Sequence, residues 1–280
     1  MEARDSDVTG IYVQEDETVK TIKTATLNTH YCEEGIPDGA AIIFSNSLGS
    51  NMSMWRPQVD RFVSQFRIIR YDHRGHGKTE VPPGPYSFDV LCNDVVALMD
   101  ALGIERAHFV GLSMGGMTAL GMAIDHADRL LSITSANCVA QIAGDAVNVW
   151  DERISAVKAN GLEPILDGTL ERWFTAGMRE TRPAEIEPVR QMIAATPVDG
   201  YIACCGALKR LNYLDKIASI DLPTLFIAGA HDVGAPAVAM QDMHRRVNGS
   251  QYVELDAAHV SNIERSEEFN QALGDFLGST

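Results

Sequence analysis

The chain has 280 residues, of which 45% are hydrophobic, so a single core can bury enough surface to fold without disulfides or a structural metal. Its 23 Lys and Arg against 38 Asp and Glu give a formal net charge of −15, which argues against nucleic-acid binding. No apolar run approaches the roughly 20 residues of a membrane helix, and the first residues lack the features of a secretory signal. The five cysteines show no zinc-ligand spacing, so we expect reduced thiols and a cytoplasmic protein.

The first half of the chain alternates between strand and helix signals. Residues 1–18 are polar and acidic and predict a loose N-terminal extension, and residues 19–31 predict a hairpin or two edge strands. Further strands are predicted at 40–44, 67–71, 107–111 and 130–134, with helices between them at 54–65, 89–102 and 114–126. This alternation predicts right-handed crossovers and a mostly parallel sheet with flanking helices.

The alternation stops between residues 140 and 212, where helical stretches such as 149–159 and 186–195 occur without a convincing strand. It resumes with a strand at 224–228, a helix at 237–247, a strand at 251–255 and a closing helix at 267–277. We therefore predict an α/β core formed by residues 19–139 and 213–280. A helical cap, residues 140–212, is inserted after the sixth strand.

The strongest local motif is Gly-Leu-Ser-Met-Gly-Gly at residues 111–116, which follows a predicted strand and precedes a predicted helix. A serine held at such a sharp turn presents its hydroxyl outward, and small residues two positions away let the chain segments pass closely. The N–H of Met114 can then face the oxyanion that forms when Ser113 attacks a carbonyl. The alternative is a glycine-rich turn with an incidental serine, but the flanking elements favour a nucleophile.

A serine nucleophile needs a base, and the base needs an orienting acid. In this type of fold both lie on loops at the carboxyl ends of late strands, in the chain order serine, acid, histidine. His259 follows the strand predicted at 251–255, and Asp232 follows the strand predicted at 224–228. We therefore predict that Ser113, Asp232 and His259 form a catalytic triad.

Three other aspartates are weaker candidates for the acid. Asp256 lies only three residues before His259 on the same loop, which is too near along the chain for it to approach the imidazole easily. Asp215 and Asp221 precede the strand that Asp232 follows, so they start at the wrong end of the sheet. Position along the chain therefore favours Asp232.

The second donor to the oxyanion is expected from residues 45–50, the loop after the third strand. We assign it to the N–H of Leu48, because the backbone can turn sharply at Gly49. The side chains of Asn46 and Ser47 are predicted to brace this loop through hydrogen bonds.

A polar cluster at residues 72–77 contains Asp72, His73, Arg74 and His76. Metal binding is one interpretation, but the glycines interleaved with these residues favour a tight turn braced by an Asp–Arg pair. No metal and no organic cofactor are expected.

Trp150 and Trp173 lie in the predicted cap and are candidates for its core. Because the cap would cover the carboxyl ends of the strands, Trp173 is also a candidate for lining the substrate pocket.

Together the motifs resemble the α/β-hydrolase superfamily and, within it, the 3-oxoadipate enol-lactonases. The resemblance extends over residues 19–277. It rests on Asn-Ser-Leu-Gly at 46–49, Met-Trp-Arg-Pro-Gln at 54–58, Asp-His-Arg-Gly-His-Gly at 72–77, the serine motif at 111–116, Arg-Trp-Phe-Thr at 172–175 and Asp-Ala-Ala-His at 256–259. The serine motif and the Asp-x-Arg-Gly-x-Gly element belong to the whole superfamily, whereas Asn-Ser-Leu-Gly and Arg-Trp-Phe-Thr discriminate more finely.

This resemblance implies a serine hydrolase that cleaves a carboxylic ester, in particular a small lactone, through an acyl-enzyme on Ser113. It also carries the family's triad onto Ser113, Asp232 and His259. A general carboxylesterase or a perhydrolase-type enzyme is the alternative within the same chemistry, and a ligand receptor is the alternative of another class. The expected partner is a small-molecule ester or lactone, with no nucleic acid and no membrane, and a homo-oligomer remains possible.

The enol-lactone of this family carries a free carboxylate, which the net charge of −15 repels. A cation at the pocket must then compensate locally, and Arg172, next to Trp173, is the leading candidate because a guanidinium can bind a carboxylate bidentately. The alternative is that Arg172 forms a surface ion pair with Glu171 or Glu163.

Overall fold

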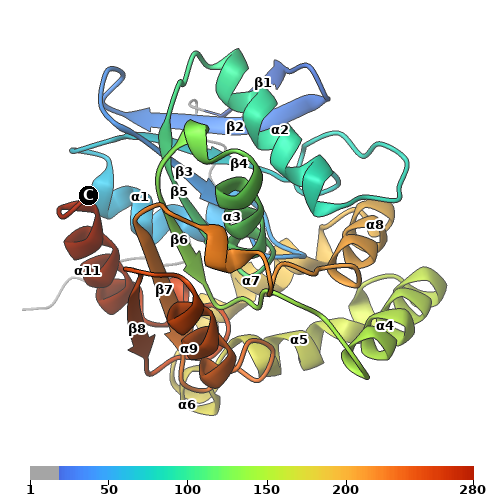
Figure 1. The fold of residues 1–280 in the computed structure, drawn as a ribbon. Coiled ribbons are helices and arrows are strands. Elements are labelled where there is room, and N and C mark those ends of the chain that lie inside the picture. Colours follow the sequence, from blue (N-terminus) through green and yellow to red (C-terminus); the bar gives the residue numbers. More distant parts are fainter. Residues whose placement is uncertain (1–18) are drawn as a thin grey trace, which may run out of the picture.

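The structure is a computed structural model that describes residues 19–280; the extension predicted at residues 1–18 lies outside them. The described residues form an eight-stranded sheet in the order β1-β2-β4-β3-β5-β6-β7-β8 (Figure 1). The first two strands pair as an antiparallel hairpin, β2 pairs antiparallel with β4, and the other strands are parallel. The strands are β1 (Val19–Lys23), β2 (Asn28–Gly35), β3 (Ala41–Ser45), β4 (Arg67–Tyr71), β5 (Ala107–Leu112), β6 (Leu130–Ala136), β7 (Thr224–Gly229) and β8 (Gln251–Leu255).

Helices cover both faces of the sheet. They are α1 (Arg56–Phe62), α2 (Phe88–Ala101), α3 (Met114–Asp125), α9 (Ala237–Arg246), α10 (Ser261–Glu264) and α11 (Ser266–Leu277). Helices α2, α3 and α9 bury their apolar side chains against one face, and α1 and α11 against the other. Strand β3 serves both cores, since Ile43 faces the first and its neighbours Ile42 and Phe44 face the second. The prediction of a mostly parallel sheet with flanking helices is confirmed.

Five further helices lie between β6 and β7. They are α4 (Ala146–Asn160), α5 (Leu166–Trp173), α6 (Ala176–Thr181), α7 (Pro183–Ala194) and α8 (Val198–Leu208). We call residues 140–212 the helical insertion; α4, α5 and α6 run along the lower edge of the view in Figure 1. An isolated antiparallel bridge joins Gln141 to Asn212 and so brings the two ends of the insertion together. Within residues 19–280, none of the helices combines the length and hydropathy that spanning a bilayer requires.

The predicted elements agree with the structure in type, and the differences lie at their ends. The helix expected at 54–65 begins as a 3₁₀ turn at Met52–Trp55 and ends at Phe62. Helix α2 is capped by the Ser87 side chain and is followed by Gly103, whose φ of +64° is accessible to glycine at little cost. The single turn α10 was not predicted, because four residues are too few to show a helical period.

Helix α8 lies directly on the turn that follows β4. A Cβ added at Gly200 would stand 2.0 Å from the carbonyl oxygen of Gly75, and one added at Gly75 would stand 2.5 Å from the Cα of Gly200. Both contacts are with backbone, which cannot rotate away as a flexible side chain can. This pair of glycines therefore sets how closely the insertion approaches the core.

We predict that Gly200→Ala destabilises the protein by about 1–3 kcal/mol, because overpacking forces the two backbones apart. Gly206→Ala on the same helix is the matched control, since its nearest neighbour outside the helix is the end of the flexible Arg210 side chain at 3.8 Å. Alanine there should be neutral or stabilise by up to about 1 kcal/mol through helix propensity. Urea unfolding measures both; equal effects of the two substitutions would contradict the close packing of Gly75 and Gly200.

Candidate active site

Ser113 lies at the turn between β5 and α3 in a backbone conformation that non-glycine residues rarely adopt, with φ +57° and ψ −116°. Its N–H donates to the carbonyl of Ala136 on the neighbouring strand at 2.8 Å. A Cβ at Gly111 would stand 2.0 Å from the carbonyl oxygen of Gly115, and a Cβ at Gly115 would stand 2.0 Å from that of Ser45. A side chain at Gly111 or Gly115 would therefore collide with a neighbouring backbone segment, so both positions require glycine.

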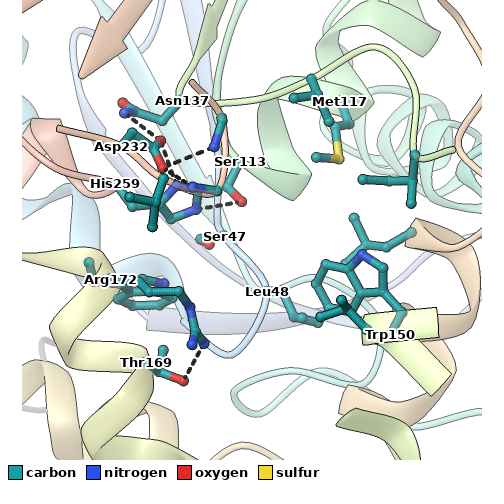
Figure 2. A pocket seen from close by; sticks show the side chains of 18 of the residues that line it. Ser47, Leu48, Ser113, Met117, Asn137, Trp150, Thr169, Arg172, Asp232 and His259 are labelled. Carbon is teal, nitrogen blue, oxygen red and sulfur yellow. Dashed lines mark hydrogen bonds and ion pairs between the residues drawn. The ribbon is translucent and has the colours of Figure 1, made fainter. Parts of the chain in front are cut away.

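The structure brings Ser113, His259 and Asp232 together from three separate loops (Figure 2). The Oγ of Ser113 lies 2.9 Å from Nε2 of His259, and Nδ1 of the same ring lies 2.8 Å from Oδ2 of Asp232. If the Nδ1 proton is donated to the carboxylate, Nε2 is left free to accept the serine proton. This arrangement can convert a hydroxyl into a nucleophile.

Asp232 is buried and accepts hydrogen bonds at both carboxylate oxygens. The N–H groups of Gly234 and Ala235 donate to Oδ1 at 2.8 and 3.0 Å, and the side-chain amide of Asn137 donates to Oδ2 at 3.1 Å. Burial on its own raises the pKa of this carboxyl, but the facing His259 and these donors outweigh it and hold the pKa below its usual range. Asp232 therefore stays ionised and keeps accepting the imidazole N–H.

The rival aspartates lie elsewhere. Asp256 is exposed and pairs with His231 at 2.8 Å and with Arg265 at 2.9 Å. Asp215 and Asp221 are also exposed. None of the three is hydrogen-bonded to His259 within residues 19–280.

The loop after β3 brings Leu48 to the cavity beside Ser113, and its N–H is the predicted second oxyanion donor. Within the described chain, neither this N–H nor that of Met114 donates a hydrogen bond, so both remain available for an oxyanion. Asn46 braces the loop as predicted, because its amide donates to the carbonyl of Tyr71 at 2.8 Å. The expectation for Ser47 is wrong: its hydroxyl makes no hydrogen bond to residues 19–280, and the residue lines the cavity in front of Ser113.

The turn at residues 72–77 supports this loop from behind. The N–H of Gly49 donates to Nε2 of His76 at 2.9 Å, and Nε2 of His73 lies 3.2 Å from the carbonyl oxygen of Asn46. Burial lowers the pKa of His76 to about 4, and burial together with the nearby His76 lowers that of His73 to about 3. Both rings are therefore neutral at physiological pH.

The Asp–Arg pair predicted for this turn does not involve Asp72. Arg74 instead forms a bidentate ion pair with Asp94 on α2, with N–O distances of 2.5 and 2.6 Å. Asp72 accepts from His30 at 2.7 Å and from the N–H groups of Met52 and Lys78. Asp72 and Arg74 therefore lie close in sequence but have different partners in the structure. In residues 19–280, no group of three or more His, Cys, Asp or Glu side chains could hold a metal ion.

Two buried residues that the sequence did not indicate hold the triad loops. Asn137 has φ +47° and accepts a hydrogen bond from Ser261 at 2.5 Å while donating to Asp232. Glu264, 2% exposed, accepts from the N–H of Ala258 at 2.8 Å and from the N–H of Thr175 at 3.1 Å. No motif marks either residue, and only their spatial neighbours reveal them.

A cavity of about 320 Å³ lies between the triad and the helical insertion, a size that suits a small organic molecule. Trp173 lines it, with its ring centroid 6.1 Å from that of His259, and so does Trp150. Arg172 also lines it (Figure 2). The ion pair considered as an alternative for Arg172 is not formed within residues 19–280, where Glu163 pairs with Arg190. Arg153, which the sequence did not single out, lies on the same wall of the cavity.

Comparison with known proteins gives consistent matches. The model of the alpha/beta hydrolase fold family matches residues 40–266. The chain is 40% identical to 3-oxoadipate enol-lactonase 1 of Acinetobacter baylyi, over 88% of this chain and 91% of that protein, and 38% identical to enol-lactonase 2 of the same organism, over 90% and 94%. The crystal structure of the enol-lactonase from Burkholderia xenovorans LB400 superposes with a TM-score of 0.90 at 38% identity, over 92% of this chain and all of that one.

We predict that Asp232→Asn lowers kcat roughly 10³- to 10⁴-fold, because an asparagine amide can stabilise the wrong imidazole tautomer. Asp256→Asn is the matched control and should leave kcat unchanged, since the exposed Asp256 side chain pairs with His231 and Arg265 and with no other residue of 19–280. Steady-state assays compare the two variants. The reverse ranking would show that Asp232 is not the acid.

The depressed pKa of Asp232 also predicts a dependence of stability on pH. A carboxyl whose pKa is lower in the folded than in the unfolded protein stabilises the fold above its unfolded pKa of about 3.9. This contribution is lost as the pH falls through the folded pKa. The difference in unfolding free energy between wild type and Asp232→Asn should therefore be larger at pH 7 than at pH 3, as measured by urea unfolding; a pH-independent difference would contradict it.

Proposed function

The chain belongs to the α/β hydrolase fold family, as its motifs predicted, and on that premise we propose that its substrate is a small lactone bearing a carboxylate, such as 3-oxoadipate enol-lactone. It is a hydrolase of carboxylic esters. The observation that carries the proposal is the hydrogen-bonded series Ser113–His259–Asp232, which opens onto a cavity of about 320 Å³ with arginines on its far wall. The names of the relatives support the choice of lactone.

In the proposed reaction, Oγ of Ser113 attacks the lactone carbonyl while Nε2 of His259 takes the hydroxyl proton. Asp232 holds the ring and stabilises the imidazolium that forms. The N–H groups of Leu48 and Met114 stabilise the negative charge that develops on the carbonyl oxygen. These two donors belong to rigid backbone, so little reorganisation is needed as the charge develops.

The ring C–O bond then breaks, and the imidazolium returns its proton to the leaving oxygen. In a lactone this oxygen stays attached to the acyl group, so the open chain remains on Ser113 as a single acyl-enzyme. Water next attacks the acyl carbon with His259 again as the base, and the serine leaves as the free hydroxyl. The net change is the addition of one water, and one proton is released as the new carboxylic acid ionises to a carboxylate. An enol released on ring opening becomes the ketone.

The cysteines bear on the proposed setting of the reaction. Cys92, Cys138, Cys204 and Cys205 are buried thiols without disulfides. Burial raises the pKa of Cys138 and Cys205 to about 12, which keeps both as unreactive thiols. Such thiols fit a cytoplasmic enzyme, which is the location we propose.

The test is a comparison of three substrates: 3-oxoadipate enol-lactone, the neutral γ-butyrolactone and p-nitrophenyl acetate. We expect many turnovers per enzyme molecule and the highest kcat/KM for the enol-lactone. A preference for neutral esters would overturn the lactone assignment in favour of a general esterase. Near single-turnover behaviour on every substrate would instead indicate a ligand receptor.

Ser113→Ala should reduce hydrolysis of all three substrates by about 10³-fold or more, leaving the residual rate that bound water and the oxyanion donors provide. The melting temperature of the variant controls for misfolding. Full-rate hydrolysis by a folded Ser113→Ala protein would exclude the acyl-enzyme mechanism.

A further inference from the structure

Two guanidinium groups converge on a single hydroxyl inside the cavity. Arg153 on α4 donates through Nη2 to Oγ1 of Thr169 at 2.8 Å. Arg172 on α5 donates to the same oxygen at 3.4 Å (Figure 2). The Thr169 hydroxyl donates its own proton to the carbonyl of Ile165 at 2.7 Å. Its oxygen therefore serves both arginines only as an acceptor.

Neither guanidinium has a carboxylate partner within residues 19–280. Asp167 on α5 and Glu163 in the 3₁₀ turn before it both pair with Arg190 outside the cavity. Asp232 is the only carboxylate among the described residues that line the cavity, and its oxygens are engaged by the triad and its supporting amides.

Burial and the adjacent positive charge of Arg153 lower the pKa of Arg172, and they outweigh the opposite effect of Tyr201 and Glu171 nearby. Arg153 is half-buried and Arg172 is more exposed, and the two like charges meet at Thr169 without an ion pair inside residues 19–280. A bound anion would relieve their mutual repulsion.

Arg153 is held rigidly in place. Its Nε donates to the hydroxyl of Tyr201 at 2.5 Å, and its guanidinium carbon lies 5.7 Å from the centre of the same ring. Burial raises the pKa of Tyr201, so the hydroxyl stays protonated and accepts this bond. The Nη1 groups of Arg153 and Arg172 donate to no residue in the described part of the chain. Directed donors that are fixed before a ligand binds suit a planar carboxylate.

We propose that Arg153 and Arg172 form one anion site that binds a carboxylate remote from the reacting carbonyl. The reaction at Ser113 is taken from the proposed function; the site itself rests on the two unpaired guanidiniums. It selects esters and lactones that carry a free carboxylate against neutral ones. After ring opening the product is a dicarboxylate, with its new carboxylate at Ser113 and its original one on the arginines, so free dicarboxylates of similar length compete with substrate.

The first experiment measures KM for 3-oxoadipate enol-lactone and for p-nitrophenyl acetate in Arg153→Met and Arg172→Met. We expect the ratio of the two KM values, anionic over neutral, to rise about 10- to 100-fold in each variant, the range for losing a charge-assisted hydrogen bond. Arg153→Lys, which keeps the charge, should recover part of the loss. Arg190→Met is the matched control, because its guanidinium pairs with Glu163 and Asp167 outside the cavity, and it should leave the ratio unchanged.

The second experiment does not require the lactone to be the substrate. Adipate, with its neutral analogue adipamide as control, is added to the hydrolysis of p-nitrophenyl acetate by the wild type and the same variants. We expect competitive inhibition by adipate alone, weakened at least 10-fold by Arg153→Met or Arg172→Met.

The outcomes separate the two proposals. Arg-dependent inhibition by adipate in an enzyme that does not hydrolyse the enol-lactone would keep the anion site and overturn the lactone assignment. Hydrolysis of the enol-lactone with an unchanged KM ratio and no inhibition by adipate would keep the function and overturn the anion site.

Discussion

The whole site depends on one steric constraint, the contact of three backbone segments around Ser113. The turn after β5 closes against its own helix at Gly111 and Gly115, and Gly115 lies against the carbonyl of Ser45. The left-handed conformation of Ser113 costs on the order of 1–3 kcal/mol and persists because the surrounding contacts leave no alternative. Since Ser45 ends β3 and the loop that carries Leu48 follows it, the same contact positions the N–H groups of Leu48 and Met114, the proposed oxyanion donors, relative to Ser113.

The side chains around Ser113 differ in their charge state. Burial keeps His73 and His76 neutral, so they act as fixed hydrogen-bonding groups behind the oxyanion loop. Asp232 stays ionised because donors surround it. Inside a protein such fixed charges and dipoles act more strongly than in water, and they need little rearrangement during reaction. Arg153 and Arg172, which belong to the helical insertion, line the same cavity and carry its positive charge.

The wall of the cavity and the loop of His259 share their supports. Glu264 accepts from Ala258, next to His259, and from Thr175, which follows Trp173 by two residues. The N–H of Val260 donates to the carbonyl of Trp173 at 3.2 Å. The loop that carries His259 and the cavity wall at Trp173 are therefore positioned by the same hydrogen bonds.

The sequence by itself determined the order and type of the main elements and the three residues that meet at the site. Short apolar runs mark strands buried on both faces, and positions after strand ends predict which side chains gather at one edge of a parallel sheet. Only the tertiary structure decided that Arg74 pairs with Asp94, that Asn137 and Glu264 hold the triad loops and that Arg153 joins Arg172 at Thr169. Periodicity along the chain reports the burial of a backbone segment, whereas these pairs depend on distances that arise only when separate elements pack together.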